Sequence, residues 1–347
     1  IAEETGLDAF TFEMGSLSLD SDNNPGVLYM QLDDIACPSS CNVTTTFKLA
    51  KRASDFTWST STINSSLASS GVSANPKNIQ LLFPNNTDYP LAFYCGADYN
   101  PVWSVSTTTD PYLFNNTTVS STDVAVNTSM GLAYNTSSEY VAMTYIASGG
   151  QLVFATSALS LPEEEEAWNG NLSSITDLGS NTWTRLIYAN DQYNYFYAGA
   201  NDEGNYYINL TTSTNGVDGT WSEDNWVTDS PIRPSVDMGD SFPIFDIQYN
   251  ASSSYFGMTY YVSSTGAMVF TTSTNGATWG PTNTIYTYDG AEGEEWVIGM
   301  DYLEGTDYIA ITYEFDKVAL SSDAGANWSF ATMSAINSST DDLMTVN

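Results

Sequence analysis

The sequence contains no histidine, and this absence removes several kinds of active site and metal site at once. Ser-His-Asp and Cys-His hydrolases need an imidazole base, and many zinc sites are ligated by histidine. Histidine is also the usual general base near neutral pH. Hydrolases of these two classes and histidine-ligated zinc enzymes are therefore excluded.

Basic residues are nearly as scarce. Lys and Arg together number 7 against 41 Asp and Glu, which gives a formal net charge of −34. Nucleic-acid binding depends on clustered Lys and Arg, and so does docking on an anionic membrane. The chain also lacks a continuous apolar run of the roughly 18 residues that a membrane-spanning helix needs. We therefore expect neither nucleic-acid binding nor membrane insertion.

Cysteine is rare as well, with 3 residues in the chain. Cys37 and Cys41 flank a turn-prone Pro-Ser-Ser segment, so we expect a disulfide between them in an oxidising compartment. Cys95 lies in an apolar run and is expected to be a buried thiol, although its pairing with either of the other two stays open. Three thiols without histidine do not predict a metal site, and no cofactor is expected.

Asn, Ser and Thr are abundant instead, and they form many N-x-Ser/Thr sequons. This motif is the acceptor for N-linked glycans on the surfaces of secreted proteins. The number of sequons exceeds modestly what the composition alone would give, and accidental sequons in a bacterial surface protein are the alternative. We predict a secreted, extracellular glycoprotein. The candidate acceptors are Asn42, Asn64, Asn85, Asn115, Asn116, Asn127, Asn135, Asn171, Asn209, Asn250, Asn327 and Asn337.

Short segments rich in Tyr, Val, Ile, Thr and Phe alternate with Gly, Asn, Asp and Ser turns, which is typical of an all-β chain. One pattern recurs six times: an apolar first strand, a second strand after a turn, and a third strand followed by a turn and an aromatic residue. The predicted first strands are Met14–Leu19, Ile79–Phe83, Gly131–Tyr134, Arg185–Tyr188, Phe245–Tyr249 and Val297–Tyr302. The aromatic residues are Trp58, Phe114, Trp168, Trp221, Trp279 and Trp328.

A repeat of this size with four short strands is typical of a propeller blade. We predict an all-β, six-bladed β-propeller of four-stranded blades that forms a single domain over residues 1–347. A doubled β-sandwich is the alternative. The approximate blades are residues 1–63, 64–123, 124–178, 179–236, 237–290 and 291–347.

The turn at residues 321–328 reads Ser-Ser-Asp-Ala-Gly-Ala-Asn-Trp. It resembles the Asp-box, S-x-D-x-G-x-x-W, of the sialidase-like and sortilin-like β-propellers (the BNR repeat). The Asp can accept backbone N–H bonds inside the turn, and the Gly can take a positive φ. Residues 272–279 form a weaker copy with Thr274 at the Asp position, and residues 212–221 a third. The predicted structural residues are Ser321, Asp323, Gly325, Trp328, Gly276, Trp279, Gly216 and Trp221.

The resemblance implies a fold and not an activity, because Asp-boxes in that superfamily lie away from the active site. Its sialidases use three arginines, a Tyr–Glu pair and an Asp. This chain has only Arg52, Arg185 and Arg233, and the first strand of its first unit has no arginine. The high negative charge would also repel an anionic sugar. We therefore predict a non-catalytic member.

Some polar residues lie in or beside the predicted first strands, where they would face the axis of a propeller. The candidate ligand-binding residues are Arg185, Asp246, Asp301 and Trp296. A pair of carboxylates here could hydrolyse a glycosidic bond. The segment from Asp20 to Gly26 resembles the start of a calcium loop, although a hairpin turn explains it better. Calcium elsewhere in so acidic a chain stays open.

These features favour a non-enzymatic role. We predict a structural, assembly or binding module of a cell surface, extracellular matrix or fibril, with copies of itself or extracellular glycans as partners. The first alternative is a lectin-like propeller that stacks glycans on exposed Tyr and Trp side chains. The second alternative is a carboxylate-dependent glycoside hydrolase.

Overall fold

The computed structural model describes the strands of the chain and many of its turns. The described residues are 10–20, 24–33, 43–52, 58–68, 79–84, 89–95, 100–106, 108, 112–118, 130–135, 138–148, 150–158, 169–172, 184–200, 206–214, 245–262, 265–287, 299–303, 305–313, 317–332, 334–335 and 344–345. All regular structure among them is β-strand, so they contain no helix that could cross a membrane.

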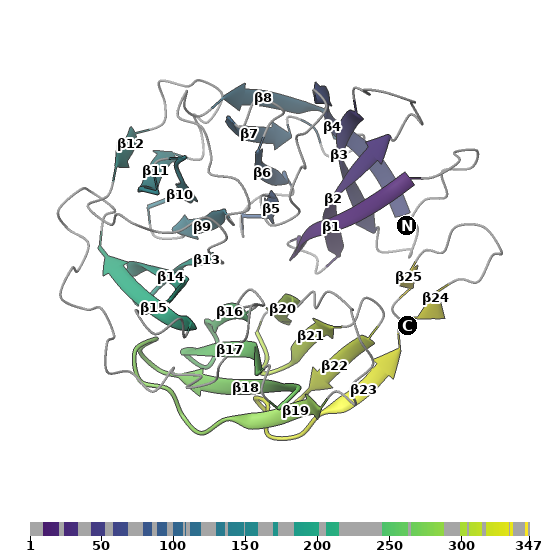
Figure 1. Ribbon diagram of the computed structural model, residues 1–347. Helices are drawn as coiled ribbons and strands as arrows, with labels where there is room; N and C mark the ends of the chain where they lie inside the picture. The colour runs from purple at the N-terminus through teal and green to yellow at the C-terminus, as the bar shows by residue number, and fades with distance from the viewer. Residues whose placement is uncertain are drawn as a thin grey trace. The chain divides into compact units, whose positions relative to one another are not determined.

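The chain divides into two compact units. Among the described residues each has three larger antiparallel sheets, and the second also has a two-stranded one. The first unit comprises Ile1–Asn181 with Gly216–Gly219. Within each sheet, consecutive strands lie side by side in chain order (Figure 1). The first sheet of the first unit contains β1 (Phe10–Leu19), β2 (Pro25–Asp33), β3 (Val43–Arg52) and β4 (Trp58–Ala68). The second sheet contains β5 (Ile79–Leu82), β6 (Leu91–Cys95), β7 (Pro101–Ser106) and β8 (Phe114–Thr118). The third sheet contains β9 (Gly131–Asn135), β10 (Tyr140–Ile146), β11 (Leu152–Ala158) and β12 (Asn169–Leu172).

The second unit comprises Thr182–Asn215 and Thr220–Asn347. Its first sheet has three strands among the described residues, and the other two have four each. The strands are β13 (Thr184–Ala189), β14 (Gln192–Ala200) and β15 (Tyr206–Ser213); β16 (Phe245–Asn250), β17 (Tyr255–Val262), β18 (Ala267–Ser273) and β19 (Asn283–Thr287); β20 (Gly299–Tyr302), β21 (Ile309–Tyr313), β22 (Lys317–Ser321) and β23 (Ser329–Thr332); and a small pair, β24 (Ser334–Ala335) with β25 (Met344–Thr345).

Apolar side chains fill the space between successive sheets of each unit. In the first unit Phe47 of one sheet stacks on Tyr94 of the next, with ring centroids 4.2 Å apart. In the second unit Phe196 and Phe256 meet edge to face in the same way. The first strands of neighbouring sheets also contact one another, β1 with β5 and β9 with β5, and β16 with both β13 and β20. Each unit is therefore a stack of sheets joined through their faces and first strands.

The prediction of an all-β chain built from repeated antiparallel sheets is confirmed. The described first strands overlap the segments that the repeat predicted for them. The limits between repeats are less accurate, because β4 continues to Ala68, beyond the predicted boundary at residue 63.

Candidate functional site

Three of the predicted ligand-binding residues lie on the first strands of three successive sheets in the second unit. Arg185 belongs to β13, Asp246 to β16 and Asp301 to β20. Because the first strands of these sheets contact one another, residues 61 and 55 positions apart in sequence come into one row. Trp296, the fourth candidate, lies outside the described residues.

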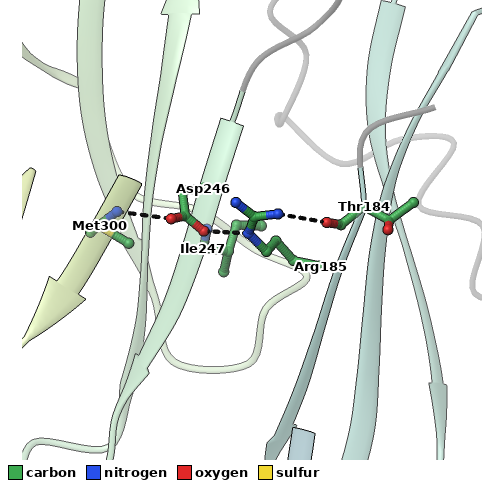
Figure 2. Close-up of polar contacts among 5 residues, drawn as sticks. All are labelled: Thr184, Arg185, Asp246, Ile247 and Met300. Carbon is green, nitrogen blue, oxygen red and sulfur yellow. Dashed lines mark hydrogen bonds and ion pairs between the residues drawn. The ribbon is translucent and has the colours of Figure 1, made fainter. Parts of the chain in front are cut away.

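Arg185 and Asp246 form a buried ion pair (Figure 2). The Arg185 Nε donates to Asp246 Oδ1 at 2.6 Å, and a terminal guanidinium nitrogen donates to the backbone oxygen of Thr184 at 3.0 Å. The two side chains keep only 17% and 5% of their surface exposed. A charge-assisted bond of this kind is strong, and its removal would leave a charge buried without a partner.

The Asp246 carboxylate also binds two backbone groups. Its Oδ1 accepts the N–H of Ile247 and its Oδ2 the N–H of Met300, both at 2.8 Å (Figure 2). Met300 belongs to β20, so this one carboxylate joins its own strand to the arginine of β13 and to the backbone of β20. Both oxygens of Asp246 are thus engaged in contacts within the protein. Asp246 therefore has the geometry of a structural residue that joins neighbouring strands.

Asp301 differs from Asp246 because it is half-buried and accepts the backbone N–H of Tyr302 at 2.8 Å. Burial raises the pKa of its carboxyl to about 7, and the nearby negative charge of Asp246 adds to the increase against the effect of the Tyr302 hydrogen bond. A carboxyl group with such a pKa can hold or release a proton near neutral pH.

A second buried ion pair lies in the first unit. Lys51 Nζ is 2.7 Å from Asp20 Oδ2, and Asp20 Oδ1 accepts the backbone N–H of Asn24 at 2.7 Å. The ammonium also lies over the rings of Phe83 and Tyr112, at 5.2 and 5.3 Å from their centroids. Asp20 thus closes the turn between β1 and β2, as the hairpin interpretation expected. No group of three or more acidic, Cys or His side chains that could hold a metal occurs among the described residues.

The Asp-box segment after β22 is held by its own side chains. Asp323 Oδ1 accepts the backbone N–H of Asn327 at 2.8 Å, and Ser321 Oγ accepts the N–H of Gly325 at 2.9 Å. Gly325 has a φ of +85°, and the Trp328 indole donates to its backbone oxygen at 3.1 Å. The side-chain and backbone N–H groups of Asn327 and the hydroxyl of Ser321 donate to the Asp323 carboxylate and lower the pKa of this exposed carboxyl.

The weaker copy after β18 forms the same kind of turn by a different residue. Asn275 Oδ1 accepts the N–H groups of Ala277 and Thr278, at 2.9 and 2.8 Å. The sequence comparison had placed Thr274 at the Asp position, but the structure gives that role to Asn275. The amide oxygen of Asn accepts the same backbone bonds as a carboxylate oxygen, which explains how the turn forms without an aspartate.

Both turns lie against an aromatic ring of the preceding sheet. A Cβ added to Gly325 would lie 2.3 Å from Phe270, and Trp328 packs edge to face on the same ring. Gly276 and Trp279 meet Phe196 in the same manner. The turns therefore contribute to packing between sheets. Gly216 and Trp221 lie outside the described residues.

The predicted glycan acceptors fall into distinct environments. Asn250 is buried, and its amide nitrogen donates to Thr306 and Asp307 while its oxygen accepts from Ser252 and Ser253. A glycan on the Asn250 amide nitrogen would compete with the hydrogen bonds that this nitrogen makes inside the turn. Asn135 is also buried and accepts the N–H of Ser138.

The other acceptors are more exposed or lie outside the described side chains. Asn115, Asn116 and Asn327 are exposed. Asn64, Asn171 and Asn209 lie in β4, β12 and β15, but their side chains are outside the description. The remaining candidates, which lie outside the described residues altogether, are Asn42, Asn85, Asn127 and Asn337, together with Cys37 and Cys41.

Two tyrosines of β14, Tyr193 and Tyr195, are buried and are therefore not available to stack on a ligand. The exposed aromatic rings of the described residues include Tyr89, Tyr140 and Tyr308. Sequence analysis also missed Lys51 and Asn275 as structural residues. The scarcity of basic residues could have pointed to Lys51, because a base retained among so few is expected to have a specific partner.

No family model matches the sequence, and no curated protein matches it. Solved structures match its fold over most of its length. AofleA from Arthrobotrys oligospora has a TM-score of 0.61 and 10% identity, over 95% of this chain and 91% of its own. The fucose-specific lectin from Aleuria aurantia has a TM-score of 0.53 and 10% identity, over 89% and 90%.

An Aleuria aurantia lectin variant in complex with Fucα1-6GlcNAc has a TM-score of 0.56 and 9% identity, over 92% of this chain and 94% of its own. These neighbours are β-propeller proteins. The chain therefore has the fold of the propeller superfamily, and the low identity extends the likeness no further than the fold.

Proposed function

We propose that the chain is a secreted glycan-binding β-propeller whose six sheets are the blades. The observation that carries this proposal is the fold match to the fucose-specific lectin, which spans about nine-tenths of both chains. That match favours the glycan-binding alternative over the assembly role that the sequence analysis placed first.

The carboxylates of the second unit support binding rather than catalysis. A glycosidase needs two carboxyl groups that can exchange protons or attack the sugar. Asp246 has both oxygens engaged by Arg185, Ile247 and Met300. Burial raises the pKa of the Asp301 carboxyl to about 7. We assign Asp301 the role of accepting hydroxyl hydrogen bonds from a bound sugar.

Calorimetric titration with Fucα1-6GlcNAc tests this proposal. The wild-type chain should bind it and should not bind GlcNAc alone. Asp301→Ala should weaken binding roughly ten-fold, because a hydrogen bond to a charged acceptor contributes about 1.5 kcal/mol or more. Asp191→Asn is the matched control, since Asp191 is an exposed acid in the β13–β14 turn and its variant should bind normally.

Two results would count against the proposal. Absence of binding by the folded wild-type chain to fucosylated and other neutral glycans would overturn the glycan-binding function. Undiminished binding by Asp301→Ala would leave the function in place and remove Asp301 from the site.

A further inference from the structure

Two sequons overlap in β8, the strand at the end of its sheet. The sequence Asn115-Asn116-Thr117-Thr118 contains one sequon that starts at Asn115 and a second that starts at Asn116. Both have Thr at the third position, so the motif itself does not distinguish them. The structure does, because neighbouring side chains in a strand point to opposite faces of the sheet.

Asn116 faces the first sheet of the chain and is bonded across the gap between the two sheets. Its amide nitrogen donates to the backbone oxygen of Ile63 in β4 at 3.1 Å. Its oxygen accepts the hydroxyls of Ser104 and, at 3.2 Å, Tyr94. Ser104 is its cross-strand partner in β7 and is fully buried, so this network belongs to the contact between β4 and β8.

Asn115 lies on the opposite face, across from Val105 of β7. Both asparagines are exposed, but the Asn115 side chain, unlike that of Asn116, makes no hydrogen bond within the described part of the chain. Because β8 ends its sheet, the described structure places no further strand beyond it. A large substituent on the Asn115 amide would therefore break no hydrogen bond of the described structure.

N-linked glycosylation joins the side-chain nitrogen of Asn to the first sugar of a lipid-pyrophosphate-linked oligosaccharide. The N–C bond to the anomeric carbon forms, the anomeric C–O bond breaks, the amide loses one proton, and the lipid pyrophosphate leaves with the bonding electrons. The bulky product must then fit the folded protein. On Asn116 it would be attached to the atom that donates to Ile63, and it would separate the two sheets at this point.

We propose that Asn115 is the glycan acceptor of this double sequon and that Asn116 is reserved for the contact between the sheets. This assignment is independent of what the protein binds. It requires passage through a secretory pathway, and a eukaryotic secretion host with an added signal peptide supplies that passage in the experiment. Chains glycosylated on Asn116 would fold poorly and be depleted from the secreted material.

Two threonine variants separate the overlapping motifs without changing either asparagine. Thr117→Ala removes the Asn115 sequon and keeps that of Asn116, whereas Thr118→Ala does the reverse. Peptide mass spectrometry of secreted protein, after enzymatic deglycosylation in ¹⁸O water, reports each site. In the wild type we expect a glycan on Asn115 and none on Asn116. Asn115 should stay glycosylated in Thr118→Ala. In Thr117→Ala neither Asn115 nor Asn116 should carry a glycan in the secreted protein.

Occupancy of Asn116 in the secreted wild type, or of neither residue, would overturn the assignment. So would transfer of the glycan to Asn116 in a Thr117→Ala protein that melts at the wild-type temperature. Asn250 is the internal control, because its buried and fully bonded amide must be empty if folded structure decides occupancy.

Discussion

The two buried ion pairs, one in each unit, fulfil different tasks. Lys51 and Asp20 belong to the same sheet, and the lysine contacts the next sheet through the faces of Phe83 and Tyr112. Arg185 and Asp246 belong to different sheets, and Asp246 also holds the backbone of β20. The first pair fastens a hairpin and covers aromatic rings, whereas the second joins three first strands directly.

The difference follows from the geometry of the two bases. A guanidinium offers a planar set of donors that can bind a carboxylate and a backbone oxygen together, as Arg185 does. An ammonium is a point charge that can bind one carboxylate and lie over aromatic rings, as Lys51 does. In a chain with 7 basic residues, both units use a base for internal structure.

The largest effect is expected at Asp246, because its removal disturbs three strands at once. Asp246→Ala should lower the free energy of unfolding by about 3–5 kcal/mol, since it leaves the buried guanidinium and the N–H of Met300 without their acceptor. Urea unfolding of the second unit, followed by fluorescence, measures this. A loss below about 1 kcal/mol would show that the contacts of the Asp246 carboxylate are not important for stability.

A smaller loss is expected at Lys51. Lys51→Met keeps an apolar contact with the rings but removes the cation paired with the buried Asp20 carboxylate, and should cost about 2 kcal/mol. The double variant with Asp20→Asn should recover part of this loss in a double-mutant cycle. Equal losses for Lys51→Met and Asp246→Ala would contradict the distinction between the two pairs.

Asp301 and Asp20 should make the free energy of unfolding depend on pH in opposite directions. The carboxyl of Asp301 has a pKa of about 7 in the folded state against an ordinary value of 3.8. The folded state therefore keeps this proton up to a higher pH than the unfolded state does. Its contribution to stability is therefore present at low pH and is lost as pH rises through 7, on the order of 2 kcal/mol. Asp301→Asn should flatten the stability profile of the second unit between pH 4 and 7.

Asp20 should behave in the other direction. Burial alone would raise the pKa of its carboxyl, but the hydrogen bonds from Lys51 and Asn24 and the charge of Lys51 outweigh burial and lower it. Its contribution is present above pH 3.8 and is lost as the pH falls through its folded value. Thermal unfolding across pH measures both effects. If the melting temperature of Asp301→Asn changed with pH as that of the wild type does, the contrast between Asp301 and Asp20 would be contradicted.

The smallest effect is expected in the turn after β18, whose sequence resembles the Asp-box weakly. Asn275→Ala removes the acceptor for two backbone N–H groups and should cost about 1 kcal/mol, as the loss of a helix cap does. Thr274→Ala is the matched control and should change stability by less than about 0.5 kcal/mol. A larger loss of stability in Thr274→Ala than in Asn275→Ala would indicate that Thr274, the residue aligned with the Asp of the motif, holds the turn.

The strands could be predicted because their aromatic and β-branched segments repeat between clear turn residues, and the first strand of each unit carries a recognisable apolar pattern. The row of Arg185, Asp246 and Asp301 was also predictable from these strand positions. The role of Asp246 was not, because its partner N–H on Met300 is a backbone group that leaves no trace in the side-chain sequence. Sequons gave a similar difficulty, since the exposed Asn115 and the buried Asn250 both satisfy the N-x-Ser/Thr motif.

A glycan microarray probed with the intact chain tests the account most directly. The net charge of −34 should repel anionic glycans, so the account predicts retention of neutral glycans and exclusion of sialylated and sulfated ones at low salt. Failure to retain any neutral glycan, or a preference for anionic ones, would contradict it.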